Sequence, residues 1–221
     1  MRTDNGPRRS AAGRPAGPQP AKRQAILEAA VAVFLREGYA RAGVDVIADE
    51  ARVSKQTVYN HFGDKERLFI AAVDGERERA AARFAADSPS APERYDDADI
   101  RTALTAFGRR VLAVLLDERA SALRRLVIAE VARHPALRPA CAEGEPQQLV
   151  KYLAETFRRR TDRGELSVPD PATAAQQFVA LLIQQGLYQS MYGTRPITDG
   201  DTAAICENAA DLFVRAYRNE A

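Results

Sequence analysis

The sequence has few of the residues on which several classes of protein depend. Its 221 residues include two Cys, two His and no Trp. A secreted disulfide framework needs more cysteines at closer spacing, so Cys141 and Cys206 are expected to be free thiols in a reducing cytosol, not a redox pair. No Cys, Asp or His lies at ligand spacing from His134, which favours helix capping over metal binding for this residue. We expect no metal and no other cofactor.

Long apolar runs are also missing. No segment approaches the ~18 apolar residues of a membrane helix, and the N-terminus lacks the apolar stretch of a signal peptide. Hydrophobic residues make up 46% of the chain, which is enough for a core. We therefore expect a soluble cytoplasmic protein that has no membrane partner.

Catalytic motifs are absent as well. The sequence contains no G-x-S-x-G, no H-E-x-x-H, no phosphate-cradling glycine loop and no Cys/His pair with a third positioned group. We predict no catalytic residue. A small helical enzyme is a rival interpretation that assays on hydrolase and transferase substrates would test.

Charge is distributed unevenly along the chain. The net charge is +2, but residues 1–70 hold twelve Lys/Arg against eight Asp/Glu, and the remainder holds twenty against twenty-two. This asymmetry indicates that nucleic acid contacts the N-terminal part. Residues 1–20 have no periodicity and are rich in Arg, Gly and Pro, which predicts a disordered basic arm. The arm is either a solvated tail or a DNA contact, and both interpretations stay open.

Apolar periodicity predicts an all-α fold of about nine helices, because no segment alternates with period two. We expect a helix-turn-helix DNA-binding domain of three helices at 21–66 after the 1–20 arm, and a helical effector-binding and dimerisation domain at 67–221. The expected helices span about 21–37, 44–51, 55–62, 65–86, 97–116, 120–133, 146–161, 171–192 and 201–218.

The segment 44–66 carries the functional prediction, because it resembles two short helices joined by a tight turn. Ser54 is a good N-cap for the second of them, and Gly63 ends it. Val58 and Phe62 face inward, which leaves a polar face outward, of the kind that enters the DNA major groove. The outward residues are Lys55, Gln56, Thr57, Tyr59, Asn60 and His61.

Each of these side chains has a plausible contact. Gln56 and Asn60 suit adenine, Lys55 suits guanine, and the Thr57 methyl suits thymine. Tyr59 can donate to phosphate, and Lys65 adds charge at a helix start whose N–H groups favour an anion. His61 is either a phosphate donor or a solvated residue. The alternative for every one of them is a solvated polar side chain.

These residues also carry a family resemblance, because residues 26–69 resemble the DNA-binding domain of the tetracycline-repressor (TetR) family. The C-terminal part is similar, more loosely, to one subfamily through Leu126-x-x-Ala129-Glu130, His134-Pro135 and Gly164-Glu165-Leu166. The N-terminal matches are Ala29-Ala30, Phe34, Gly38-Tyr39, Val44-Asp45, Ile47-Ala48, Ala51, Val53-Ser54-Lys55-Gln56-Thr57, Tyr59, His61-Phe62, Asp64-Lys65-Glu66 and Leu68-Phe69.

The resemblance implies a homodimer that binds a palindromic operator on double-stranded DNA and is released by a small-molecule effector, apolar or amphipathic. It implies association with the nucleoid and phosphate contacts by Tyr59 and Lys65. Two positions depart from the family. Ala42-Gly43 replaces a Thr or Ser cap ahead of the second helix, and Arg52 replaces a turn glycine. Arg52 costs about 1 kcal/mol or more if the turn needs φ > 0.

The apolar helices at about 171–192 and 201–218 predict a dimer interface in a four-helix bundle, with an ordinary monomer core as the alternative. Arg158-Arg159-Arg160 is taken as a solvated face. A sequence-independent DNA-binding protein is the second rival interpretation, and it would bind all duplexes alike. An effector pocket is expected to be lined by Phe107, Leu126, Phe157, Phe178, Gln185 and Tyr188.

Overall fold

The computed structural model describes residues 19–86, 98–142 and 145–218, and these residues form an all-α fold. The predicted arm at 1–20 lies almost wholly outside the described residues. Within the described part of the chain, the one β contact is an isolated bridge between Leu166 and Arg218. The elements are α1 (Gln19–Arg41), α2 (Val44–Glu50), α3 (Lys55–Phe62), α4 (Lys65–Ala86), α6 (Ile100–Leu115), α7 (Glu118–Val131), η1 (Pro135–Leu137), α8 (Pro139–Ala142), α9 (Glu145–Asp162), α10 (Pro171–Gln189) and α11 (Asp199–Tyr217).

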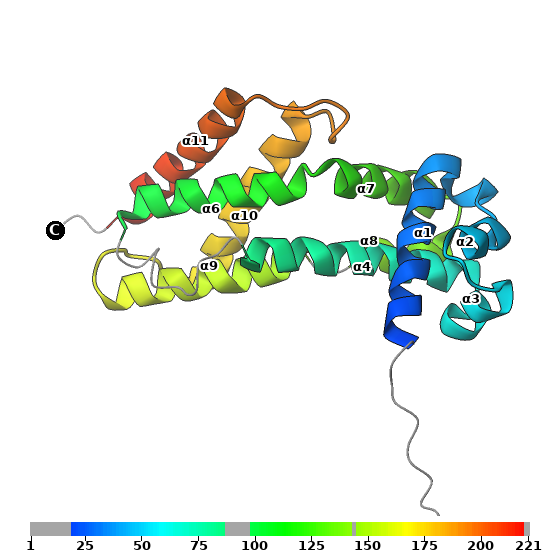
Figure 1. The fold of residues 1–221 in the computed structure, drawn as a ribbon. Helices are drawn as coiled ribbons and strands as arrows, with labels where there is room; N and C mark the ends of the chain where they lie inside the picture. Colours follow the sequence, from blue (N-terminus) through cyan, green and yellow to red (C-terminus); the bar gives the residue numbers. More distant parts are fainter. Residues whose placement is uncertain (1–18, 87–97, 143–144, 219–221) are drawn as a thin grey trace, which may run out of the picture.

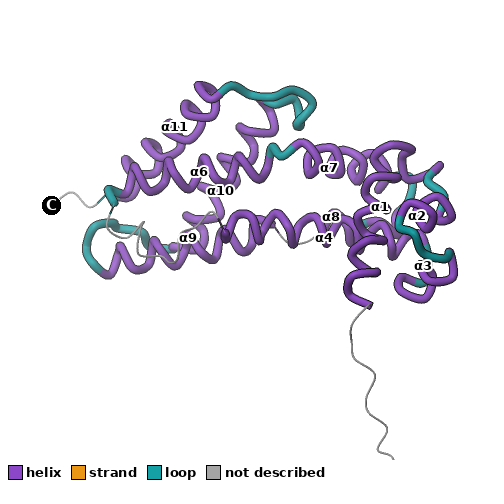
Figure 2. The backbone as a smooth tube through the Cα atoms, viewed as in Figure 1, coloured by secondary structure: helices purple, strands orange, loops and turns teal. Residues whose placement is uncertain are grey.

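The molecule is elongated, with α1, α2 and α3 at one end (Figure 1). Helices α6, α9, α10 and α11 form the other end, and α4 and α7 run between the two ends. Among the loops that Figure 2 draws in teal, the longest connects α10 to α11. Helix α4 follows α3 after two residues, so a short turn connects the two helices.

The first hydrophobic core lies under the helix-turn-helix and includes the fully buried Phe34, Ile47 and Phe69. Phe34 and Phe69 pack edge to face with ring centroids 5.0 Å apart. The same cluster continues into α7 and η1 through Leu123 and Leu137. The N-terminal helices therefore share a core with the helices that follow α6, and the predicted domain bounds at 21–66 and 67–221 stay a prediction.

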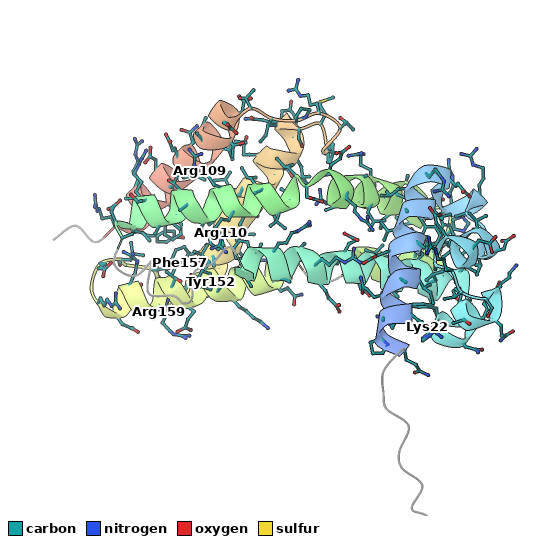
Figure 3. The ribbon with its side chains drawn as sticks, viewed as in Figure 1. Lys22, Arg109, Arg110, Tyr152, Phe157 and Arg159 are labelled. Carbon is teal, nitrogen blue, oxygen red and sulfur yellow. The ribbon has the colours of Figure 1, made fainter. Side chains whose placement is uncertain are left out.

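The second core fills the far end of the molecule with aromatic rings from four helices. Phe157 stacks on Phe213 at 4.3 Å, and Phe178 meets Phe213 edge to face at 5.7 Å. Phe107 stacks on Tyr152 at 6.0 Å. Figure 3 shows Tyr152 and Phe157 on α9, facing the space below α6. These contacts hold α6, α9, α10 and α11 together.

Helix α10 ends three residues earlier than the sequence predicts, because Met191 and Tyr192 adopt left-handed φ values of 49° and 59°. The turn is held against α7, where Arg125 donates to the carbonyl oxygens of Tyr192 and Gly193. A Cβ on Gly193 would lie 2.5 Å from the Cβ of Ser121, so a glycine is required there. The prediction of a helix to residue 192 was wrong because this contact with α7 is not local in sequence.

Candidate DNA-binding surface and effector cavity

The turn between α2 and α3 needs a positive φ at Arg52, which is the case in which the sequence predicts a cost in free energy. Arg52 has φ of 55°, so a non-glycine residue occupies a left-handed position. Its side chain is exposed. Ahead of α2, Gly43 is the N-cap in an extended conformation and offers no side-chain cap. Of the two departures from the family pattern, Arg52 therefore strains the turn, and Gly43 leaves the start of α2 without a side-chain cap.

Helix α3 begins and ends where the sequence predicts. The Ser54 Oγ accepts from the backbone N–H of Thr57 at 3.1 Å and lies 2.8 Å from the Thr57 hydroxyl. Gly63 closes the helix at φ of 82°. Val58 and Phe62 are buried against the first core. The bond to Ser54 holds the Thr57 hydroxyl, which leaves its methyl group as the part suited to a base contact.

The outward side chains of α3, named here the recognition face, are Lys55, Gln56, Thr57, Tyr59, Asn60 and His61. Lys55, Gln56, Tyr59 and Asn60 are exposed, whereas Thr57 and His61 are half-buried. The Gln56 amide nitrogen donates to the Asn60 carbonyl oxygen at 2.9 Å, which orders the two amides side by side. The Lys55 ammonium lies 4.0 Å from the Asp45 carboxylate, an exposed ion pair that a DNA contact can replace at low cost.

Lys65 lies in the first turn of α4 and is half-buried. Its ammonium donates to the Ala40 carbonyl oxygen at 3.1 Å and lies 4.9 Å above the Tyr39 ring. Burial lowers the pKa of Lys65, and the charges of Glu130 and Glu37 oppose that shift. An ammonium has three donors, and the bond to Ala40 uses one of them. The contact holds Lys65 against the C-terminal end of α1.

Arg23 was not singled out from the sequence. Its guanidinium lies over the Phe62 ring, 5.4 Å from the centroid, and so places a cation from α1 beside the last turn of α3. Lys22 lies next to it near the start of α1 (Figure 3). The adjacent Lys-Arg pair at 22–23, three residues ahead of the buried Ile26, is the signal that could have indicated this contact.

The six residues predicted to line an effector pocket do not line one cavity. Phe107, Phe157 and Phe178 are buried together in the second core. Leu126 packs against the first core instead. Gln185 and Tyr188 point outward on α10, and Tyr188 is 72% exposed.

The described residues line a cavity and a groove, and of the six predicted residues only Gln185 is in the lining of either. A cavity of about 310 Å³ lies between α4, α7 and α8. A groove of about 260 Å³ lies between α10 and α11. The lining residues of the cavity are Val73, Glu76, Arg77, Ala120, Leu123, Arg124, Val127, Ile128 and Ala140.

Several large apolar side chains on α10, on α11 and in the turn after α10 are exposed. Tyr188 on α10, Leu212 on α11 and the adjoining Met191 and Tyr192 are each more than half exposed. Leu212 also lines the groove between the two helices, as does Gln185.

Other kinds of site find no support in the described part of the chain. No three His, Cys, Asp or Glu side chains gather there in a way that could hold a metal ion. Among the same residues, no helix has the length and apolar content needed to cross a membrane. Cys206 is buried without a disulfide partner, and burial raises the pKa of its thiol to about 11. The side chain of Cys141 lies outside the described residues.

Comparison with known proteins agrees with this geometry. Residues 26–72 match the family model described as bacterial regulatory proteins of the tetR family, and residues 102–219 match the AefR-like transcriptional repressor C-terminal domain. The HTH-type transcriptional regulator UidR of Escherichia coli K12 is 28% identical over 169 residues, which cover 75% of this chain and 79% of UidR. An uncharacterized HTH-type regulator of Mycobacterium bovis is 30% identical over 203 residues, covering 89% of this chain and 91% of its own.

Solved structures show the same fold. A putative TetR-family regulator from Mesorhizobium loti superposes with a TM-score of 0.78 at 29% identity, covering 90% of this chain and 98% of its own. The flavonoid-responsive regulator FrrA superposes with a TM-score of 0.72 at 26% identity, covering 91% and 100%. The chain belongs to the TetR family of transcriptional regulators, with an N-terminal DNA-binding helix-turn-helix and a C-terminal helical domain.

Proposed function

We propose that the protein is a repressor that binds a palindromic operator as a homodimer and leaves it when a small-molecule effector binds. The observation that carries this proposal is the recognition face, an ordered row of polar side chains on a helix whose opposite side is buried. Gln56 and Asn60 are its base-reading residues, with Lys55 and the Thr57 methyl beside them. Tyr59, His61 and Lys65 contact phosphate.

The dimer forms through α10 and α11, the helices whose exposed face carries Tyr188 and Leu212. A four-helix bundle of two helices from each protomer buries these side chains. The dimer then places two copies of α3 in successive major grooves, ~34–36 Å apart. The function requires double-stranded DNA and therefore a place in the cytoplasm, at the nucleoid.

Selection from a random duplex library, followed by footprinting, tests the DNA-binding part of the proposal. We expect one two-fold symmetric site with half-sites about one helical turn apart. Tyr59→Phe and Lys65→Ala should each weaken binding to this site, whereas Lys151→Ala, an exposed lysine on α9, should not. Equal binding to all duplexes would instead support the sequence-independent alternative.

Sedimentation velocity tests the dimer. Leu212→Arg replaces an apolar side chain of α11 with a charged one, at a position that is 61% exposed in the single chain. We expect this variant to sediment as a monomer that retains its helical circular dichroism and loses affinity for the two-fold site. A dimer that persists in Leu212→Arg would assign the interface to another surface.

The effector part of the proposal is supported by the presence of a cavity beside α4, the helix that follows α3. A ligand changes DNA affinity to the extent that it binds the two conformations unequally. FrrA, a structural relative, is described as responsive to flavonoids, which illustrates small-molecule control on this fold.

A further inference from the structure

The cavity between α4, α7 and α8 has one apolar side and one charged side. Val73, Leu123 and Val127 supply buried apolar surface, joined by Ile128 and Ala140. Its volume of about 310 Å³ lies at the lower end of the ~300–1,000 Å³ typical of small-molecule sites. The site is therefore suited to a small occupant with a substantial apolar part.

Two arginines line the charged side, one from each of the two long helices. On α4, Arg77 donates to the Asp74 carboxylate at 3.2 Å and to the Ala140 carbonyl oxygen. On α7, Arg124 donates to the Leu115 carbonyl oxygen at 2.9 Å. These bonds fix both guanidinium groups at the cavity wall. Arginine forks bind carboxylate and similar anions in a bidentate manner.

Among the described residues that line the cavity, Glu76 is the one acid, and two arginines match its charge. Its side chain is 6% exposed and accepts from Arg79 at 2.6 Å and from Arg119 at 3.0 Å. Neither Arg79 nor Arg119 lines the cavity. Arg79 also pairs with Glu28 at 3.2 Å. In the described part of the cavity lining itself, two arginines stand against one acid.

We propose that this cavity is a binding site for a small amphipathic anion, with a carboxylate or sulfonate group between Arg77 and Arg124 and an apolar body against α7. A cationic compound would meet two like charges there. A neutral apolar compound would remove water from guanidinium groups without replacing its hydrogen bonds, which is costly. The role of this anion as effector depends on the proposed function, but its binding does not.

The position of the site supplies the link to DNA. Glu76 joins α4 to α7 through Arg119, and Arg77 joins α4 to α8 through the Ala140 carbonyl. An anion that takes Arg77 as its partner competes with the bond from Arg77 to the Ala140 carbonyl and so changes how α4 packs against α8. Because α4 follows α3 directly, that change alters the placement of the recognition face.

A matched pair of fluorescent probes tests the site in the full-length protein. The anionic dye is 8-anilino-1-naphthalenesulfonate, and the neutral dye is N-phenyl-1-naphthylamine, which has the same apolar body without the sulfonate. We expect the anionic dye to bind the protein about tenfold or more tightly than the neutral one. Octanoate should displace the anionic dye, whereas 1-octanol should displace the same dye about tenfold more weakly.

Variants assign the binding to the cavity. Arg77→Met and Arg124→Met should each weaken the anionic dye about tenfold while changing the neutral dye less than about twofold. Ala120→Phe fills the cavity and should weaken both dyes. Arg158→Met, at an exposed position on α9, removes an arginine elsewhere and should change neither. Thermal unfolding followed by circular dichroism identifies any variant that fails to fold. If one arginine variant does not fold, the other still tests the site.

The outcomes separate this inference from the proposed function. Equal affinity for the two dyes, or anionic-dye binding unchanged in both folded arginine variants, would overturn the site and leave the repressor proposal standing. Arginine-dependent binding that leaves affinity for the footprinted duplex unchanged would support the site and contradict the effector response.

Discussion

Replacing Arg52 with glycine should stabilise the protein. Arg52 has φ of 55° in the turn between α2 and α3. That conformation costs a residue with a Cβ about 1–2 kcal/mol, whereas glycine adopts it freely. Glycine also gives the unfolded chain more conformational freedom, and this effect cancels about 0.4–1 kcal/mol of the gain in stability. The free energy of unfolding should therefore rise by about 0.5–1 kcal/mol, and Tm should rise by about 2–4 °C per kcal/mol for a chain of this size.

Arg52→Ala is the matched control, because it removes the guanidinium and keeps the Cβ. Thermal unfolding of both variants, followed by circular dichroism at one protein concentration, should show stabilisation in Arg52→Gly alone. The reasoning would be refuted if Arg52→Gly lowered Tm, or if Arg52→Ala raised it equally, because strain at the Cβ would then not be the cause.

The same pair of variants tests whether Arg52 attracts DNA phosphate. Both remove an exposed positive charge ahead of the recognition face. If the guanidinium contacts a phosphate, both should weaken binding to the footprinted duplex and reduce the dependence of log K on log salt by about one unit. A fall in affinity in one variant alone would point to the backbone of the turn.

Further predictions concern the packing of the C-terminal helices. The Phe157 ring is fully buried and stacks on Phe213. Phe157→Ala should therefore lower the free energy of unfolding, measured by urea titration, by about 3–5 kcal/mol. A loss below about 1 kcal/mol would mean that the ring is not packed as described. Thr198→Ala removes a capping box at the start of α11 that also involves Asp201 and should cost about 1 kcal/mol, whereas an unchanged midpoint would contradict that cap. Burial raises the pKa of the Cys206 thiol from 9.0 to about 11, so the folded state holds this proton more tightly than the unfolded state, and stability should fall as pH rises from about 9 to about 11. Cys206→Ala should reduce that slope, and the same slope in both proteins would exclude this thiol as its source.

The sequence was most informative where structure is set by neighbouring residues. Ser54 and Gly63 bound α3 because an N-cap hydroxyl and a left-handed glycine act within a few residues. The same reasoning identified the turn at Arg52. The resulting recognition face has the exposed positions that the sequence predicted, although Thr57 and His61 are half-buried.

Contacts between distant segments could not be predicted in this way. Helix α10 ends early because Arg125 on α7 bonds to the following turn and Ser121 on α7 packs against its Gly193. The predicted effector pocket combined inward positions on several helices, but periodicity does not show which inward residues meet a cavity and which fill the core. Leu126 packs against the first core and Phe157 lies in the second, since the two cores are defined by tertiary packing.

The most direct test of the account measures base discrimination at single positions of the operator. Gln56→Ala and Asn60→Ala should lower affinity for the selected site and flatten the preference at one or two base pairs in each half-site, by about 1–3 kcal/mol per position. Preference at the other positions should persist. A uniform loss of affinity with all preferences intact, or no change in either variant, would contradict the claim that α3 reads the bases.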